Sequence, residues 1–87
     1  MYLHLGKNTL VQIERIVAIF DLDNSSQSYF TRDYLRRAEQ NGRVINISED
    51  LPKSFVVCLD SDGMQIVYLS QLSSATLLKR SETMSFE

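Results

Sequence analysis

The chain has 87 residues, of which 44% are hydrophobic and 23% are charged, a composition typical of one small globular domain. Eleven acidic residues against nine basic ones give a formal net charge of −2 and a pI near 5.3. This balance excludes a chain that is basic throughout, so any surface for nucleic acid must be local. The single cysteine excludes an intrachain disulfide. The single histidine is far from it in the sequence, which argues against a structural zinc site.

The small size of the chain points to self-association. A domain of this length buries only about 60% of the surface of its unfolded chain, and neither a disulfide nor a zinc site is available to add stability. The first six residues lack a basic region, and no apolar run reaches the roughly 18 residues that a membrane span needs. We therefore expect a cytoplasmic homo-oligomer with no membrane contact, a compartment that the unpaired Cys58 also favours.

The first half of the chain predicts a hairpin, a strand and a helix. Residues 2–5 and 9–13 read as two strands, joined by Gly6, Lys7 and Asn8, which tolerate positive φ. The run 16–20 is apolar on both faces and rich in β-branched residues, which predicts a central strand covered on both sides. A polar connection over 21–27 leads to a helix, with Ser26 or Ser28 as its cap.

This helix carries one apolar face and ends at Asn41-Gly42, where glycine serves the left-handed position after the last turn. Its apolar face is formed by Phe30, Tyr34, Leu35 and Ala38.

The second half predicts strands and a short terminal helix. Strands are expected at 44–48, 55–59 and 64–69, with Pro52 separating the first two and a turn at 60–63 joining the last two as an antiparallel hairpin. Capping hydroxyls and terminal cations predict a helix over 73–80, followed by a disordered tail over 81–87. The order of elements predicts a single α+β domain over residues 1–80, with no βαβ winding.

Few residues suit catalysis. Cys58 and His4 form the one available Cys/His pair, but Cys58 lies in an apolar strand, where a thiol packs as a small hydrophobe with a raised pKa. Asp21 and Asp23 could act as paired carboxylates, although turn chemistry explains them more simply. We therefore expect no enzyme, no cofactor, no metal and no small-molecule substrate.

Cations gather around the predicted helix. Arg32 and Arg36 share one face of it, Arg37 projects beside them, and Arg15 precedes the predicted central strand. These residues could contact phosphate. The alternative is that they only support a solvated helix, because Asp33 and Arg37 have the spacing of an ordinary ion pair.

Three blocks of sequence, in this order, resemble the RemA/RemB family of small bacterial extracellular-matrix regulators, most closely its RemB members. They comprise His4-Leu5-Gly6 with Val11 and Arg15-Ile16-Val17-Ala18-Ile19, then Arg37-Ala38-Glu39-Gln40-Asn41-Gly42, then Lys53-Ser54-Phe55-Val56-Val57 with Tyr68-Leu69-Ser70. The resemblance implies a cytoplasmic regulator of biofilm-matrix genes that binds double-stranded DNA as a ring-like homo-oligomer. Arg15 matches a family arginine implicated in function.

The loop before Phe55 departs from the family pattern. RemA-like members carry consecutive arginines there, whereas this chain has Leu51-Pro52-Lys53. The predicted DNA-contacting residues are Arg15, Arg32, Arg36, Arg37 and Lys53. The alternative is an oligomeric protein-interaction subunit of the same family that does not bind DNA.

Overall fold

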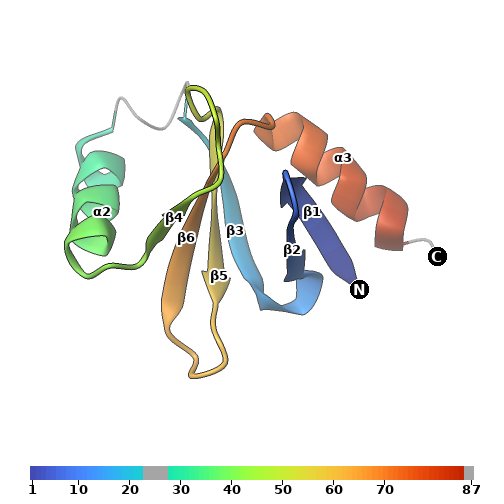
Figure 1. The fold of residues 1–87 in the computed structure, drawn as a ribbon, viewed down its shortest axis with the longest axis horizontal. Coiled ribbons are helices and arrows are strands. Elements are labelled where there is room, and N and C mark those ends of the chain that lie inside the picture. Colours follow the sequence, from blue (N-terminus) through green and yellow to red (C-terminus); the bar gives the residue numbers. More distant parts are fainter. Residues whose placement is uncertain (23–27, 86–87) are drawn as a thin grey trace.

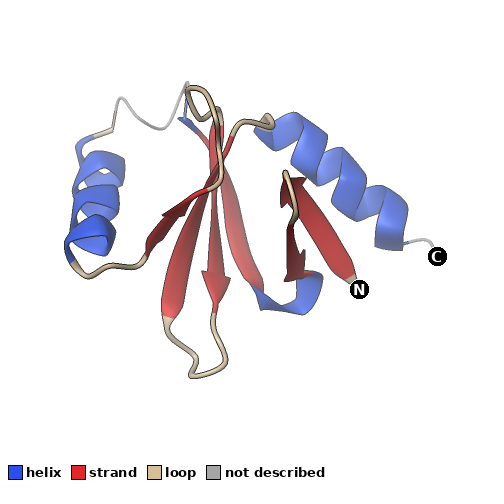
Figure 2. Cartoon of the chain, viewed as in Figure 1, coloured by secondary structure: helices blue, strands red, loops and turns tan. Residues whose placement is uncertain are grey.

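A computed structural model describes residues 1–22 and 28–85 of the chain. The α+β domain places two helices at its ends and the strands between them (Figures 1 and 2). The elements in chain order are β1 (Tyr2–Gly6), β2 (Thr9–Gln12), a 3-10 turn (Ile13–Arg15), β3 (Ile16–Asp21), α2 (Tyr29–Gln40), β4 (Val44–Asn46), β5 (Ser54–Leu59), β6 (Gln65–Ser70) and α3 (Ser74–Ser85).

The strands form a two-stranded sheet, β1-β2, and a four-stranded sheet in the order β3-β5-β6-β4. The β5-β6 hairpin is antiparallel, as the sequence predicts, while β4 runs parallel to β6. Because β3 and β6 are both antiparallel to β5, β3 and β4 run parallel at opposite edges of the sheet. The connection between them contains α2, so the fold includes one βαβ crossover, split by two strands, that the sequence analysis did not expect.

Strand β5 separates two apolar cores. Its residues from Ser54 to Cys58 are all buried, and their side chains alternate between the two faces of the sheet. Val56 and Cys58 face the β1-β2 hairpin and α3, where Leu77 is also buried. Phe55 and Val57 face α2. The domain therefore has three layers, with the four-stranded sheet in the middle.

The β1-β2 hairpin is held to this sheet through its turn. Gly6 has φ +135° and Lys7 has φ +48°, so the turn needs backbone conformations that glycine adopts without strain.

The hydroxyl of buried Ser70, at the end of β6, donates to the Leu5 carbonyl at 2.6 Å and accepts from the Leu72 N–H at 3.0 Å. One side chain thus ties the hairpin to both β6 and the start of the segment leading to α3.

The prediction of a central strand over 16–20 is wrong in position. β3 pairs with β5 alone among the described residues and lies at the edge of the sheet. Its inner residues pack on the hairpin side, but Val17 is 55% exposed and Phe20 is 40% exposed. The apolar residues on both faces of this strand predict that both faces are covered, whereas one face of β3 is open in the single chain.

Several element boundaries also differ. β4 ends at Asn46 rather than Ser48, because the Asn46 side-chain oxygen accepts from the Ser48 N–H and turns the chain away from the sheet. The last helix continues to Ser85, beyond the expected end at Arg80 and into the segment expected to be a disordered tail. Ser28 precedes α2 but makes no side-chain capping hydrogen bond, and Ser26 lies outside the described residues.

We expect Ser70→Ala to lower the free energy of unfolding by about 2 kcal/mol, since it removes a buried hydroxyl that satisfies two backbone groups. Urea unfolding followed by circular dichroism measures this. Ser61→Ala, in the exposed turn between β5 and β6, is the control and should change stability by less than about 0.5 kcal/mol. Equal effects of the two substitutions would contradict the role assigned to Ser70.

Candidate nucleic-acid interface

Arg15 closes the 3-10 turn that links the hairpin to β3, and its side chain is exposed. Its guanidinium Nε donates to the Gln12 Oε1 atom at 2.7 Å, a neutral partner that leaves the positive charge uncompensated by this contact. The turn places Arg15 beside the C-terminal end of β5, where Ile16 pairs with Cys58. This position suits a phosphate contact, because the remaining guanidinium donors can form a bidentate pair.

The three predicted arginines of α2 are exposed but share their surface with carboxylates. Asp33 accepts from Arg36 at 2.5 Å and from Arg37 at 3.0 Å, so the ion pair predicted between Asp33 and Arg37 is confirmed. Three arginines against Asp33 and Glu39 leave α2 a net charge of +1. Such exposed pairs contribute little to stability and rearrange readily, so Arg36 and Arg37 can still exchange Asp33 for a stronger anion.

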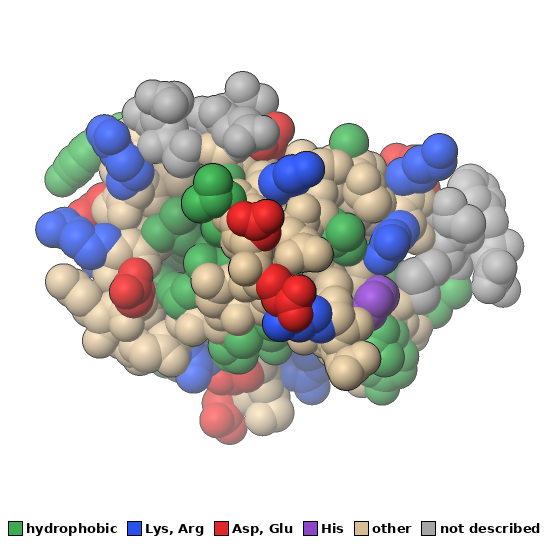
Figure 3. Space-filling model, turned by 45° about the horizontal axis from the view of Figure 1, so that its top comes forward, with side chains coloured by type: hydrophobic (Ala, Val, Ile, Leu, Met, Phe, Trp, Pro, Cys, Tyr) green, Lys and Arg blue, Asp and Glu red, His purple; other side chains and the backbone are tan. Residues whose placement is uncertain are grey.

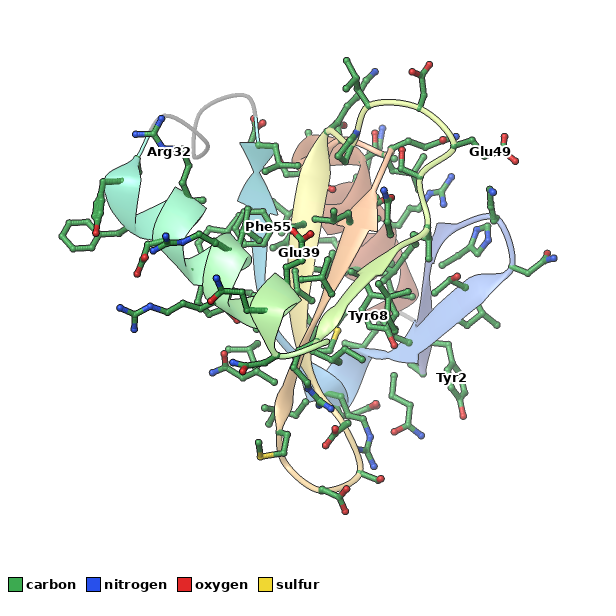
Figure 4. All side chains as sticks on the ribbon, turned by 60° about the vertical axis from the view of Figure 1, so that its left-hand side comes forward. Tyr2, Arg32, Glu39, Glu49, Phe55 and Tyr68 are labelled. Atoms are coloured by element: carbon green, nitrogen blue, oxygen red, sulfur yellow. The ribbon has the colours of Figure 1, made fainter. Side chains whose placement is uncertain are left out.

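The apolar side of α2 fixes the direction of these arginines. Tyr34, Leu35 and Ala38 pack on the Phe55 and Val57 side of the sheet, and the Tyr34 hydroxyl donates to the Gln65 side-chain oxygen at 2.7 Å. Burial raises the pKa of Tyr34, so this hydroxyl stays protonated as a donor. The arginines therefore project outward, and Figure 4 shows Arg32 at the outer margin of the molecule.

Lys53 is exposed, but its surroundings are acidic. Its backbone is held at the start of β5, with its N–H donating to Ser70 at 2.8 Å and its carbonyl accepting from Leu22 at 3.0 Å. Its side chain borders a shallow cavity of about 630 Å³ that Glu49 and Asp50 also line. Lys7 pairs with Glu49 at 2.9 Å, so one of these two carboxylates already has a cationic partner.

The five predicted residues do not form one patch in a single chain. Arg15 lies near the Cys58 end of β5 and Lys53 precedes its Ser54 end, which separates them by about 17 Å along the strand. The other three arginines belong to α2, which lies at the end of the molecule opposite α3 (Figure 1). Figure 3 accordingly shows Lys and Arg side chains spread over the face in view, with Asp and Glu between them.

The sequence analysis missed a second cationic group on α3. The sequence predicts Lys79 and Arg80 at the C-terminus of a helix, but the helix continues to Ser85 and contains both residues. Arg80 donates to the His4 carbonyl at 3.4 Å, which joins α3 to β1. The adjacent Lys-Arg pair is the sequence signal that could have marked this surface.

Of the residues considered for catalysis, Cys58 is buried and His4 is hydrogen-bonded within the hairpin. Cys58 is 2% exposed, and burial raises the pKa of its thiol to about 11. The His4 Nε2 atom forms a hydrogen bond with the Lys7 carbonyl and stabilises the hairpin turn. Asp21 lies at the end of β3, and Asp23 lies outside the described residues.

The turn over residues 60–63 is also structural. The Asp60 Oδ1 atom accepts from the N–H groups of Asp62 at 2.9 Å and Met64 at 3.0 Å. The hydrogen bond from Arg43 to the other oxygen is the main cause that lowers the pKa of Asp60. Arg43 is therefore committed to this turn, and it is not a further surface cation.

The described part of the chain shows neither a metal cluster nor a membrane-spanning helix. Within residues 1–22 and 28–85, no group of three His, Cys, Asp or Glu side chains is placed to hold a metal ion. None of the helices in this part of the chain is long and apolar enough to cross a membrane.

Comparison with known proteins decides the family. Residues 2–80 match the model of the RemA-like family, described as "Extracellular matrix regulatory protein A-like". The chain belongs to the RemA-like family. It is also 37% identical over 84 residues to the Extracellular matrix regulatory protein B of Bacillus subtilis (strain 168), a match that covers 97% of this chain and 94% of that protein. The resemblance identified from sequence, including its closeness to RemB, is thus confirmed.

Membership of the RemA-like family places the chain among regulators of the extracellular matrix and in a regulatory rather than an enzyme family. The match covers both cores and most of α3, from Tyr2 to Arg80. The family region therefore covers most of the folded unit described above, and the exposed arginines lie within it.

The buried thiol gives a direct test of the structural role of Cys58. We expect less than about one thiol in a thousand to be ionised at pH 8, so a disulfide reagent should react with the folded chain far more slowly than with the unfolded chain. The folded chain holds this proton more tightly than the unfolded chain. Its free energy of unfolding should therefore fall as the pH rises from about 9 towards 11.

The reaction is followed by absorbance at matched concentrations, with and without denaturant. Reaction of the folded chain at the rate of the unfolded chain would show a reactive thiol and would reopen the interpretation of Cys58 as a nucleophile.

Proposed function

We propose that this chain regulates biofilm-matrix genes in the cytoplasm by binding double-stranded DNA as a ring-like homo-oligomer, without a cofactor. The contacts are made by Arg15, Arg32, Arg36, Arg37 and Lys53 to the phosphate backbone. The observation that carries the proposal is the match to the RemA-like family along almost the whole domain. The exposure of these five cationic side chains supports it.

Assembly reconciles DNA binding with the acidic balance of the chain. One protomer offers a few separated cations and a net charge of −2, which is a weak footprint for a polyanion. Several copies around one duplex would repeat each cation, and avidity multiplies a modest affinity of each copy. Phosphate contacts of this kind need no base-reading helix, and sequence preference can arise from the cost of bending the DNA.

A second candidate is an oligomeric protein-interaction subunit that does not bind DNA. Two observations favour it: Asp33 neutralises part of the α2 charge, and Glu49 and Asp50 surround Lys53. The two candidates differ in one measurable property. Only the DNA-binding oligomer predicts an affinity for duplex DNA that falls steeply with salt concentration.

We expect Arg15→Ala to weaken binding to all duplex sequences to a similar degree. The slope of log affinity against log salt should fall by about one for each protomer that contacts DNA through this residue. Fluorescence anisotropy with a labelled duplex at several salt concentrations measures both quantities. Arg15→Lys is the matched control, because it keeps the charge and should keep most of the slope.

No salt-dependent binding by the unaltered chain, even at low ionic strength, would contradict DNA binding and favour the interaction subunit. Binding with an unchanged slope in Arg15→Ala would remove Arg15 alone from the interface.

A further inference from the structure

The side chain of Arg15 is held by the residue three positions before it in the chain. Gln12 ends β2 and directly precedes the 3-10 turn Ile13–Arg15. Such a turn has three residues per turn, so side chains three positions apart lie on the same side of it. The Gln12 Oε1 atom accordingly accepts from the Arg15 Nε atom at 2.7 Å. Both side chains are exposed, so this contact forms on the surface of the domain.

The Gln12 side chain is available for this contact because it does not cap the turn. A polar side chain in this position commonly accepts from a backbone N–H of the first turn, but Gln12 makes no capping hydrogen bond. The nitrogen of its amide faces Tyr2, which lies directly opposite in the hairpin, and donates to the Tyr2 hydroxyl at 3.5 Å. Figure 4 shows the Tyr2 side chain projecting from β1. This contact orients the amide with its oxygen towards Arg15.

A carboxylate close to Arg15 is occupied by another cation. β3 begins opposite the C-terminal end of β5, and Arg15 and Asp60 line the same cavity of about 270 Å³. One oxygen of Asp60 accepts from Arg43, and the other accepts from two backbone N–H groups of its own turn. Among the ion pairs that form within residues 1–22 and 28–82, none includes Arg15. The partner that orients Arg15 is therefore neutral.

The contact with Gln12 leaves the outer end of the guanidinium available. A guanidinium carries five N–H donors, of which one is on Nε and four are on the two terminal nitrogens. With Nε occupied, the terminal nitrogens form the remaining fork, which matches two oxygens of one phosphate group. Because the side chain is already oriented, it loses less conformational freedom when an anion binds.

We propose that Gln12 is a positioning residue for the DNA contact of Arg15. Its amide orients the guanidinium so that both terminal nitrogens meet one phosphate, and its neutrality keeps the positive charge of Arg15 available. This inference rests on the proposed function and describes how one of its contacts is prepared. Gln12 acts through Arg15 and does not itself touch the DNA.

The first test replaces Gln12 by glutamate, which can accept from the same Arg15 nitrogen but neutralises its charge. We expect Gln12→Glu to weaken binding to a labelled duplex nearly as much as Arg15→Ala. The slope of log affinity against log salt should fall by about one for each protomer that contacts DNA through Arg15. Gln12 is exposed, so the fold should survive, and circular dichroism with thermal melting checks this.

Asn8→Asp is the matched control for the added charge. Asn8 is exposed in the turn of the same hairpin, four positions before Gln12. This spacing corresponds to about 13 Å along an extended chain, more than the screening length of about 10 Å in 0.1 M salt. At that salt concentration we expect Asn8→Asp to change the affinity by less than about twofold.

The second test removes the acceptor without changing the charge. We expect Gln12→Met to weaken binding about threefold to tenfold, because the guanidinium loses its orientation, and to leave the salt slope unchanged. In the Arg15→Ala background the same substitution should have no further effect, since Gln12 acts only through Arg15. A residue that merely stabilised the hairpin would lower the melting temperature and would weaken binding equally in both backgrounds.

Fluorescence anisotropy at several salt concentrations measures the affinities and slopes. Three results would overturn the positioning role while the unaltered chain binds DNA. They are an unchanged slope in Gln12→Glu, an equal loss of affinity in Asn8→Asp, and an effect of Gln12→Met that persists in the Arg15→Ala background. No salt-dependent binding by the unaltered chain would instead contradict the proposed function, so the two failures are distinguishable.

Discussion

The burial of β5 is the constraint on which the rest of the domain depends. Its alternating side chains belong to two cores, with Val56 and Cys58 under the hairpin and α3, and Phe55 and Val57 under α2. Both outer layers are therefore positioned by one strand. This arrangement also sets the positions of the cationic residues. Arg15 lies beside one end of β5, and Lys53 precedes the other end. The α2 arginines lie on the outer side of a helix whose inner side packs on Phe55.

Local sequence patterns predicted much of the fold. The Gly6-Lys7-Asn8 turn, the helix over Tyr29–Gln40 and the β5-β6 hairpin depend on contacts between near neighbours in the chain, and each was predicted. The order of the strands in the sheet was not predicted, because it depends on competition between strands that are far apart in the sequence. The residues Ile16–Phe20 and Phe55–Leu59 are similarly apolar, and only the packing of α2 and the hairpin against β5 makes it the central strand.

In the candidate site, too, the features set by near neighbours in the chain could be predicted, and those set by distant contacts could not. The exposure of the arginines and the Asp33 pair could be predicted from helical spacing alone. The separation of Arg15 from Lys53 could not, because it depends on the register between β3 and β5. That separation makes oligomerisation central to the proposal. Within residues 1–22 and 28–82 the five predicted cations do not gather in one patch, and a repeated assembly would present each of them several times along one duplex.

We propose that DNA binding is a property of the assembly and not of the single chain. The most direct test is sedimentation velocity of a labelled duplex with increasing protein at low salt, which measures the mass of protein on the DNA and the mass of free protein in one experiment. We expect the DNA to sediment only with multi-protomer assemblies, and all protomers to leave the duplex together as the salt concentration rises. A single 10.0 kDa protomer that binds the duplex with the full affinity would contradict it.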